Sequence, residues 1–503
     1  MATLILASVL IILATYFYYF TTTTYKYWEK KGIPYIKPVF LFGNVADCVF
    51  RKKSVPQVFK SIYAQSNGKR YVGCYQFLKP TLYIRDPQLI EQITVKDFNY
   101  FSDHNLTASK STDPLWAHNL LSLTVYETGW RETRAKITPS FSATRLKGLI
   151  PHMQECTRNF IESLNNQQGV IQLEAKDAFR KIGNDIIASV VFGITVNSIK
   201  DPKNKFFELG KRTADFSGIR ALIFFGYTLF PTMMKYLRIR IYDNEVINFF
   251  RNLVKETLKT RKEKNIVRQD FIHLLSTTDD TNKEISKMTV DEITAHSVLF
   301  FFAGFESISS TSAFAAYQLA IRPDIQQNLY NEIKESIENG KKSFSYNDIV
   351  DMKYLEKFTS ELLRVHPPNP ALERKAVKPY NIEPKNPGEK ALLVDKNSFI
   401  WIPVEAIHKD PNYFPNPDVF DPERFNSENK KNIKPCTYIP FGNGPRNCIA
   451  SRFALLQIKM VIIELLKNFE FVSTEKTEIP LSYKPESFIS IPKNGIWIGM
   501  KAR

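Results

Sequence analysis

The stretch Phe441-Gly442-Asn443-Gly444-Pro445-Arg446-Asn447-Cys448-Ile449-Ala450 decides how the rest of this sequence is interpreted. It places one cysteine in a loop of glycine, proline and asparagine, directly before a run, Ser451 to Leu466, whose apolar pattern predicts a helix. A thiol held at a helix N-terminus and beside the cation of Arg446 is expected to have a lowered pKa. Taken alone, however, such a cysteine is more simply a small buried apolar residue near a turn.

A thiolate in a loop of this kind has one specific chemical use. It can serve as the axial ligand of a haem iron, where it favours cleavage of the O–O bond. The glycines let the backbone approach a flat macrocycle and leave amide N–H groups for the sulfur. Arg446, two residues before the cysteine, can bind a haem propionate through charge-assisted hydrogen bonds.

The ordered pattern F-G-x-G-P-R-x-C resembles the haem-binding loop of cytochromes P450. The resemblance implies a mainly α fold with small β-sheets, a single N-terminal transmembrane anchor helix and haem b as the cofactor. It further implies that Cys448 ligates the iron and that Phe441 contacts the haem. The chain departs from the family at Ala450, where the family usually has glycine. Since alanine is the smallest replacement, we expect close packing beneath the haem to be kept.

The net charge limits the partners of this 503-residue chain. Lys and Arg exceed Asp and Glu by 17, which favours nucleic acid, anionic lipid or an acidic protein as a partner. Because no nucleic-acid motif is evident, we expect no nucleic-acid partner and favour lipid head groups and an acidic redox protein. Five widely spaced cysteines give neither a disulfide framework nor a zinc site, and they fit a reducing compartment.

Residues 2–20 carry no charge and, as a helix, would span about 28 Å, close to the hydrocarbon thickness of a bilayer. Basic residues follow this span and none precedes it, which predicts a cytosolic location for the rest of the chain. A cleaved signal peptide, the alternative, would need a basic start and a clear cleavage site. We therefore predict a membrane anchor (1–24), a basic and proline-rich hinge (25–40) and a catalytic domain (41–503).

Trp130 and Arg134 are four residues apart, so on a helix they share one face and could both meet a carboxylate. An exposed amphipathic helix with one buried tryptophan would give the same pattern. The pair resembles the W-x-x-x-R element of the P450 family, which implies that both residues hold haem propionates. This basic face is also where a reductase would be expected to dock.

The capping box formed by Thr289 and Glu292 opens a helical pattern that runs to Pro323. In its middle, Gly304 and an acid, Glu306, are both unfavourable choices for an apolar helix, which indicates function. The segment 303–307 resembles the family's A-G-x-(D/E)-T element over the haem. It implies that Gly304 lets a ligand approach the helix and that Glu306 and Ser307 relay protons to bound dioxygen. Serine stands where the family usually has threonine, and we expect a working but looser relay.

Glu361 and Arg364 lie three apart on one helix face, which on its own would indicate a weak surface ion pair. With the segment after it, this pair resembles the family's E-x-x-R helix, and residues 421–425 resemble its P-E-R-F element. The resemblance implies a buried triad of Glu361, Arg364 and Arg424 that supports the cysteine loop. It also implies that Arg374 is a further propionate contact.

The resemblance also suggests a substrate pocket above the haem. The resemblance favours a lid over residues 206–242 that dips into the bilayer and admits apolar substrates, with ordinary core as the alternative. The residues that we expect to line the pocket are Trp116, Leu120, Ala303, Phe305, Ala371, Leu372 and Phe488.

These elements occur in the family's order over nearly the whole chain, and segments such as 130–139 and 302–306 most resemble insect microsomal P450s that metabolise xenobiotics. This implies a monooxygenase in the endoplasmic reticulum membrane, facing the cytosol, that oxidises small lipophilic substrates with O₂. NADPH–P450 reductase would supply its electrons, with cytochrome b5 as a second donor. Three alternatives remain open: hydroxylation of an endogenous lipid or hormone, a P450 that isomerises peroxides without a reductase, and a non-catalytic thiolate–haem ligand carrier or sensor. The sequence does not identify the substrate.

Overall fold

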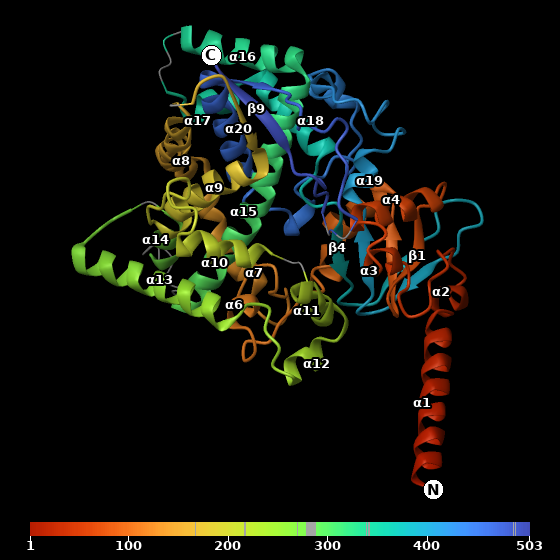
Figure 1. Ribbon diagram of the computed structural model, residues 1–503. Helices are drawn as coiled ribbons and strands as arrows, with labels where there is room; N and C mark the ends of the chain where they lie inside the picture. Colours follow the sequence, from red (N-terminus) through yellow and green to blue (C-terminus); the bar gives the residue numbers. More distant parts are fainter. Residues whose placement is uncertain are drawn as a thin grey trace.

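The computed structural model describes residues 1–503 except 166, 216–217, 269, 278–287, 339, 341–342, 486 and 488. The described residues form mainly helices, with three small sheets, as the sequence predicts (Figure 1). The α-helices are α1 (Ala2–Thr24), α2 (Tyr27–Lys30), α3 (Ala46–Val49), α4 (Val55–Gln65), α5 (Pro87–Glu91), α6 (Pro114–Ala117), α7 (Trp130–Ile137), α8 (Ala143–Leu164), α9 (Ala175–Ile187), α10 (Lys205–Ala214), α11 (Gly218–Leu229), α12 (Pro231–Tyr236), α13 (Asn244–Lys264), α14 (Phe271–Ser276), α15 (Val290–Ile321), α16 (Pro323–Glu338), α17 (Tyr346–Asp351), α18 (Lys353–Val365), α19 (Val404–His408) and α20 (Ser451–Asn468). The strands are β1 (Tyr71–Gln76), β2 (Lys79–Ile84), β3 (Val170–Glu174), β4 (Leu372–Lys375), β5 (Tyr380–Ile382), β6 (Leu392–Val394), β7 (Phe399–Ile402), β8 (Phe469–Val472) and β9 (Trp497–Ala502).

Helix α15 runs through the middle of the helical part of the molecule (Figure 1). The predicted capping box is present: the Thr289 side chain accepts a hydrogen bond from the Glu292 N–H, and the Glu292 carboxylate accepts one from the Thr289 N–H. Apolar side chains surround most of the helix, so α15 packs against α9, α10, α13 and α20 and is the centre of the core.

The largest sheet has the strand order β1-β2-β7-β4 and packs on its own apolar cluster, separate from the helical core. Strands β1 and β2 pair antiparallel, β2 and β7 parallel, and β7 and β4 antiparallel, with Arg374 of β4 opposite Ile400 of β7. A second sheet, β3-β9-β8, lies against the helical core, and β5 and β6 form a hairpin. The sheet therefore brings Arg374 to the boundary between the two packed regions.

Two of the described helices are long and apolar enough to cross a membrane, α1 and α15. The most apolar window of α15 is 67% buried, which marks it as a core helix, whereas no part of the corresponding window of α1 is buried. Helix α1 projects from the side of the molecule that carries α11 and α12 (Figure 1). The length and exposure of α1 fit the predicted membrane anchor.

The segment after α1 is fixed to the large sheet by backbone hydrogen bonds, including Ile36 N–H to Gly73 O (2.9 Å) and Gly73 N–H to Pro34 O (2.9 Å). The indole of Trp28 is 2% exposed and donates to Cys74 O at 2.9 Å. It lies directly over Gly73, where a Cβ atom would fall 2.4 Å from the indole Cγ. The absence of a side chain at Gly73 thus lets the segment after the anchor pack on β1.

We expect Gly73→Ala to lower the free energy of unfolding by about 1–3 kcal/mol, because the new methyl group overlaps the Trp28 ring and the buried indole must move. Thermal or denaturant unfolding of the purified protein measures this change. The double variant Gly73→Ala/Trp28→Leu should recover part of the loss relative to Trp28→Leu alone. Equal effects of Gly73→Ala in both backgrounds would contradict the proposed contact.

Candidate active site

The cysteine loop is held in a narrow backbone geometry. Gly442 and Gly444 have φ of 76° and 71°, and a Cβ atom on Gly444 would lie 1.8 Å from Thr94 O. The loop closes through a hydrogen bond from Cys448 N–H to Phe441 O at 2.8 Å. Glycine is needed at 442 and 444 because other residues rarely adopt these conformations.

The sulfur of Cys448 opens onto an internal cavity, and its environment differs from the sequence prediction. Burial raises the pKa of the Cys448 thiol, while the Ala450 N–H and the Arg134 guanidinium lower it by smaller amounts. Arg446 is turned away and donates to backbone carbonyls, including Ser102 O (2.7 Å) and Leu123 O (2.7 Å). The N-terminus of α20 therefore acts as expected, but Arg134 and not Arg446 supplies the nearby cation, and the expected net lowering of the thiol pKa is wrong. A bound metal ion would favour the thiolate, because a metal ion deprotonates a coordinating thiol.

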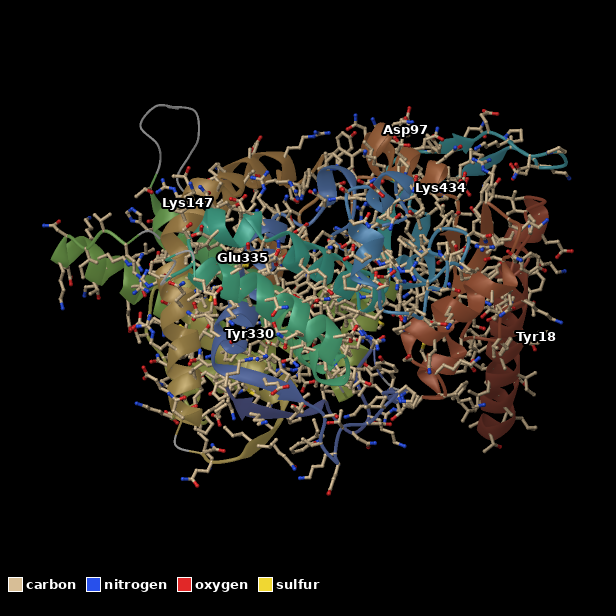
Figure 2. All side chains as sticks on the ribbon, turned by 90° about the horizontal axis from the view of Figure 1, so that it is seen from above. Tyr18, Asp97, Lys147, Tyr330, Glu335 and Lys434 are labelled. Atoms are coloured by element: carbon tan, nitrogen blue, oxygen red, sulfur yellow. The ribbon has the colours of Figure 1, made fainter. Side chains whose placement is uncertain are left out.

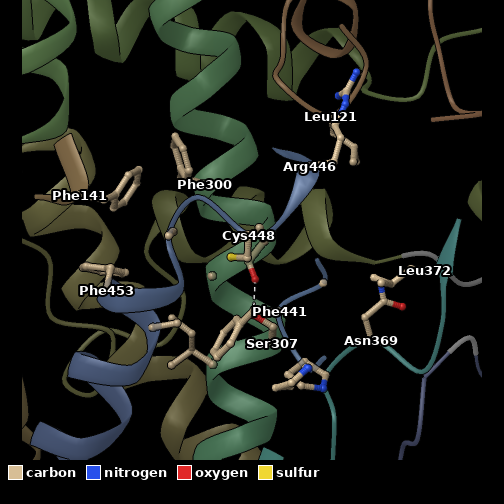
Figure 3. Close-up of a pocket in the computed structure, with 18 of the residues that line it drawn as sticks. Leu121, Phe141, Phe300, Ser307, Asn369, Leu372, Phe441, Arg446, Cys448 and Phe453 are labelled. Atoms are coloured by element: carbon tan, nitrogen blue, oxygen red, sulfur yellow. Dashed lines mark hydrogen bonds between the residues drawn. The ribbon is translucent and has the colours of Figure 1, made fainter. Parts of the chain in front are cut away.

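The cavity has a volume of about 600 Å³ and lies between the cysteine loop, α15 and the segment that leads into β4 (Figure 3). Its surface is mostly apolar, with aromatic rings from Phe141, Phe300 and Phe453. Of the residues that we expected to contact haem, dioxygen or substrate, those that line it are Cys448, Arg446, Phe441, Gly304, Ser307, Ala303, Ala371, Leu372 and Arg374.

One end of the cavity is cationic. Arg374 is 1% exposed and donates from Nη1 to Glu373 O, but its Nε and Nη2 find no partner among the described residues. Burial lowers the pKa of Arg374 to about 10 and that of Arg446 to about 9, so both guanidinium groups remain charged at neutral pH. A buried cation with two unused donors requires an anionic partner.

His104 also lines this cationic end, which the sequence analysis missed. Burial, followed by the charges of Arg446 and Arg374, holds its pKa well below the usual range, so the ring is neutral. Nothing in the local sequence distinguishes this histidine, because only the folded chain brings residues 104, 374 and 446 together.

Trp130 and Arg134 share one face of α7, as predicted, but neither is among the residues that line the cavity. The Arg446 guanidinium lies 4.2 Å from the centre of the Trp130 ring, and Arg134 lies 5.5 Å from it. Arg134 also donates to Asn447 O (3.0 Å) and Asn447 Oδ1 (2.7 Å). In this structure the pair therefore contacts the cysteine loop.

Glu306 and Ser307 point in different directions. Ser307 lines the cavity and its hydroxyl donates to Ala303 O, whereas the Glu306 carboxylate leaves the cavity and pairs with Lys176 and with Arg180 (2.7 Å) of α9. Neighbouring residues on a helix point about 100° apart, so an adjacent acid and hydroxyl need not meet.

The electrostatics of the Glu306 cluster follow from two cations sharing one carboxylate. Lys176 and Arg180 hold the pKa of Glu306 below its usual value despite burial. The pKa of Lys176 is also lowered, because burial outweighs its share of the single carboxylate. The Glu306 ion pairs therefore stabilise the fold above the ordinary pKa of a glutamate and lose this effect as the pH falls through the lowered value.

Glu361, Arg364 and Arg424 lie together in the core. Arg364 donates from Nε and Nη2 to the two oxygens of Glu361, both at 2.7 Å, and Arg424 Nε lies 3.4 Å from Glu361. Arg364 Nη1 also donates to His408 O (2.9 Å), and His408 Nε2 accepts from the Ile439 N–H (3.0 Å) at the start of the cysteine loop. The ion pairs are thus linked to the loop through His408, which the sequence analysis did not single out.

Several expected pocket residues lie outside the cavity. Trp116 is fully buried against Tyr242, Leu120 accepts a hydrogen bond from Arg446 through its backbone, and Phe305 stacks on Phe301. Phe305 faces the core because Gly304, its neighbour on α15, already faces the cavity. The prediction for Phe488 falls outside the described residues.

The cavity fits the haem that the sequence motifs predict. A thiol opens onto it, mostly apolar walls surround it, and the unpartnered nitrogens of Arg374 can receive a propionate. Cys448 would hold the iron, and Arg374 and Arg446 would bind the anionic edge.

We compared the sequence with models of protein families and with known proteins. The family model described as cytochrome P450 matches residues 33–498. Cytochrome P450 9e2 of Blattella germanica is 39% identical over 95% of this chain and 94% of its own length. Probable cytochrome P450 9f2 of Drosophila melanogaster is 35% identical over 95% of both chains, and cytochrome P450 6k1 of Blattella germanica is 33% identical over 94% and 92%.

We expect Glu361→Gln to lower stability by about 3–5 kcal/mol, because Arg364 then remains buried without its counter-charge. The same variant should purify with a reduced haem content, since the loop bearing Cys448 loses its support. Glu423→Gln removes an acid whose side chain is half exposed, and should change stability by less than about 1 kcal/mol. Equal haem content and stability for the two variants would contradict this role of the triad.

Proposed function

Because the chain belongs to the cytochrome P450 family, we propose that it oxidises lipophilic foreign compounds, such as plant toxins or insecticides, with electrons from NADPH–cytochrome P450 reductase. Family membership gives the class: a haem-thiolate monooxygenase that uses O₂ and receives electrons originating from NADPH through a redox partner. The main support for lipophilic substrates is the large, mostly apolar cavity that both Cys448 and Ser307 line.

When bound, haem b supplies the activation of O₂ and the oxidation of the substrate, and the protein supplies binding, orientation and electrostatics. We assign Cys448 to the iron, Arg374 and Arg446 to the propionates, and Phe441 to the face of the macrocycle. Trp130 and Arg134 position the cysteine loop through Arg446 and Asn447. Gly304 keeps the surface of α15 open, because any side chain there would project toward Ile187 on the cavity wall.

Ser307 and Glu306 have separate roles in the proposed proton path. Ser307 Oγ holds a proton or a water molecule at the cavity surface, where it can be passed to dioxygen. The Glu306 carboxylate is 17% exposed and lies on a different face of α15 from Ser307. If the Glu306 side chain rotated away from Lys176 and Arg180, its carboxylate could take up a proton from solvent and carry it toward the cavity. The relay therefore needs a side-chain movement or bridging water, because the two groups share no hydrogen bond in this structure.

Substrates would reach the cavity from the membrane. Helix α11 contributes Phe224 and Thr228 to the cavity wall, while Leu222, Phe230 and Leu237 of the α11–α12 region expose more than half of their surface. Such exposed apolar side chains near an anchor helix favour insertion into the bilayer. We propose that this region is the lid through which lipophilic compounds pass.

The N-terminal apolar helix anchors the protein to a membrane, and we propose the endoplasmic reticulum with the catalytic domain (41–503) in the cytosol. The proposed anchor (1–24) and hinge (25–40) precede this domain, although the hinge packs on the sheet. NADPH–cytochrome P450 reductase and cytochrome b5 are the proposed electron donors, docking on the basic face around α7. The excess of 17 positive charges suits acidic partners.

Purified holoenzyme and reductase in phospholipid vesicles test the proposed function. We expect NADPH consumption to rise when a plant toxin or an insecticide is added, with formation of a product carrying one oxygen atom from O₂. If the enzyme oxidised endogenous lipids or hormones but no foreign compound, the proposed substrate class would be wrong. Substrate binding without reductase-dependent turnover would instead indicate a ligand carrier.

We expect Ser307→Ala to lower product formed per NADPH about tenfold or more and to raise hydrogen peroxide release, because the hydroxyl at the cavity surface is lost. Ser309→Ala is the matched control, since that hydroxyl is buried against Phe305 O and Phe179 O and does not line the cavity. Ser307→Thr should restore coupling. Unchanged coupling in Ser307→Ala would exclude Ser307 from proton delivery.

A further inference from the structure

Two cavities outside the active site meet at the base of the anchor helix. The first, which we call the anchor groove, has a volume of about 360 Å³ and is lined by one side of α1, including Tyr16, Tyr19 and Phe20. The second, the lysine cavity, also has about 360 Å³ and is lined by Lys79, Lys375 and Lys396. Tyr27 and Pro80 line both cavities, so the two lie next to each other.

Three lysines and one acid, Asp395, line the lysine cavity. Lys79 Nζ donates to Thr228 O at 2.8 Å and lies 4.8 Å from the centre of the Phe399 ring, while Lys375 is its charged neighbour. Burial, followed by the charge of Lys375, lowers the pKa of Lys79 to about 8. Among the described residues, Lys79, Lys375 and Lys396 form no ion pair.

The acid at the edge of the lysine cavity is already neutralised. Asp395 pairs with Lys31 at 2.8 Å and accepts a hydrogen bond from the Tyr27 hydroxyl at 2.6 Å. Three lysines therefore converge on a space whose nearest carboxylate is occupied. An anion placed there would relieve the repulsion between Lys79 and Lys375.

The apolar groove leads from these lysines along the anchor. Residues 16–24 at the end of α1 cover about 12 Å of helix, and Tyr16 lies deeper along the anchor than Tyr27. Tyrosine and phenylalanine at 16–20 suit the membrane interface, which places the lysine cavity at the level of the lipid head groups. Thr228 and Pro231 of the exposed apolar α11–α12 region also line the lysine cavity, and Figure 1 places these helices on the side from which α1 projects.

We propose that the lysine cavity and the anchor groove form one binding site for an anionic phospholipid, with its phosphate among Lys79, Lys375 and Lys396 and one acyl chain along α1. The inference rests on membrane anchoring and is independent of the proposed substrate. A lipid fits better than a free anion because the charged cavity adjoins an apolar groove that runs toward the bilayer core. Thr228 also lines the main cavity, so the lipid would lie beside the path of substrates.

Photolabelling of the full-length holoenzyme in phosphatidylcholine nanodiscs tests this site. The probe is phosphatidylinositol with a photoreactive acyl chain, and mass spectrometry locates the label. We expect labelling within residues 16–30 and near Pro80, displaced by unlabelled phosphatidylinositol but not by phosphatidylcholine. Displacement by inorganic phosphate would show a site for free anions and would overturn the proposal.

The variant Lys79→Gln/Lys375→Gln/Lys396→Gln should weaken competition by phosphatidylinositol on the order of a hundredfold, since each surface lysine contributes about fivefold to anionic lipid binding. The control Lys334→Gln/Lys476→Gln/Lys501→Gln removes the same charge from exposed positions on the far side of the molecule, near α16 and β9 (Figure 1), and should have little effect. The haem absorption spectrum shows whether each variant is folded. If the triple variant does not fold, the single variants Lys79→Gln and Lys396→Gln are measured in its place. Equal losses in both triple variants, or no loss in either, would contradict a defined site.

Discussion

The position of one sulfur atom determines what this molecule can do. Cys448 reaches the cavity only because the loop before α20 is fixed on both sides. On one side, Arg364 contacts His408, and His408 accepts from the backbone of Ile439. On the other side, Arg134 binds Asn447, next to the cysteine. A buried ion pair by itself adds little net stability. The main contribution of Glu361 and Arg364 is therefore to fix the position of the loop that carries Cys448.

The cavity is arranged for a charged, flat and largely apolar cofactor. Side chains viewed from above fill the space around the helices (Figure 2), and side chains of α15, the cysteine loop and β4 line the chamber. Burial raises the pKa of the Cys448 thiol and lowers that of Arg374, and both shifts oppose the charged forms that the haem requires. Bound haem would relieve both conflicts, because its iron would stabilise the Cys448 thiolate and a propionate would pair with the Arg374 guanidinium.

Much of the architecture could be predicted from sequence, because it follows from local patterns. The capping box at Thr289, the exposed apolar helix α1 and the mainly helical fold are all present in the structure. Predictions of the cavity lining failed where a residue's place depends on the direction of its side chain or on packing between segments distant in sequence. Phe305 faces the core, and the cationic end of the cavity includes His104 from a loop remote from Arg374 in sequence. The thiol pKa was wrongly predicted because local motifs carry no information about burial.

The most direct test of this account is the absorption of the purified, reduced holoprotein under carbon monoxide, compared with the variant Cys448→Ser. Thiolate ligation by Cys448 predicts the strongly red-shifted Soret band after which the P450 family is named, and its loss in the variant. A red-shifted band that persists in Cys448→Ser, or a wild-type protein that binds haem without this band, would contradict the central claim.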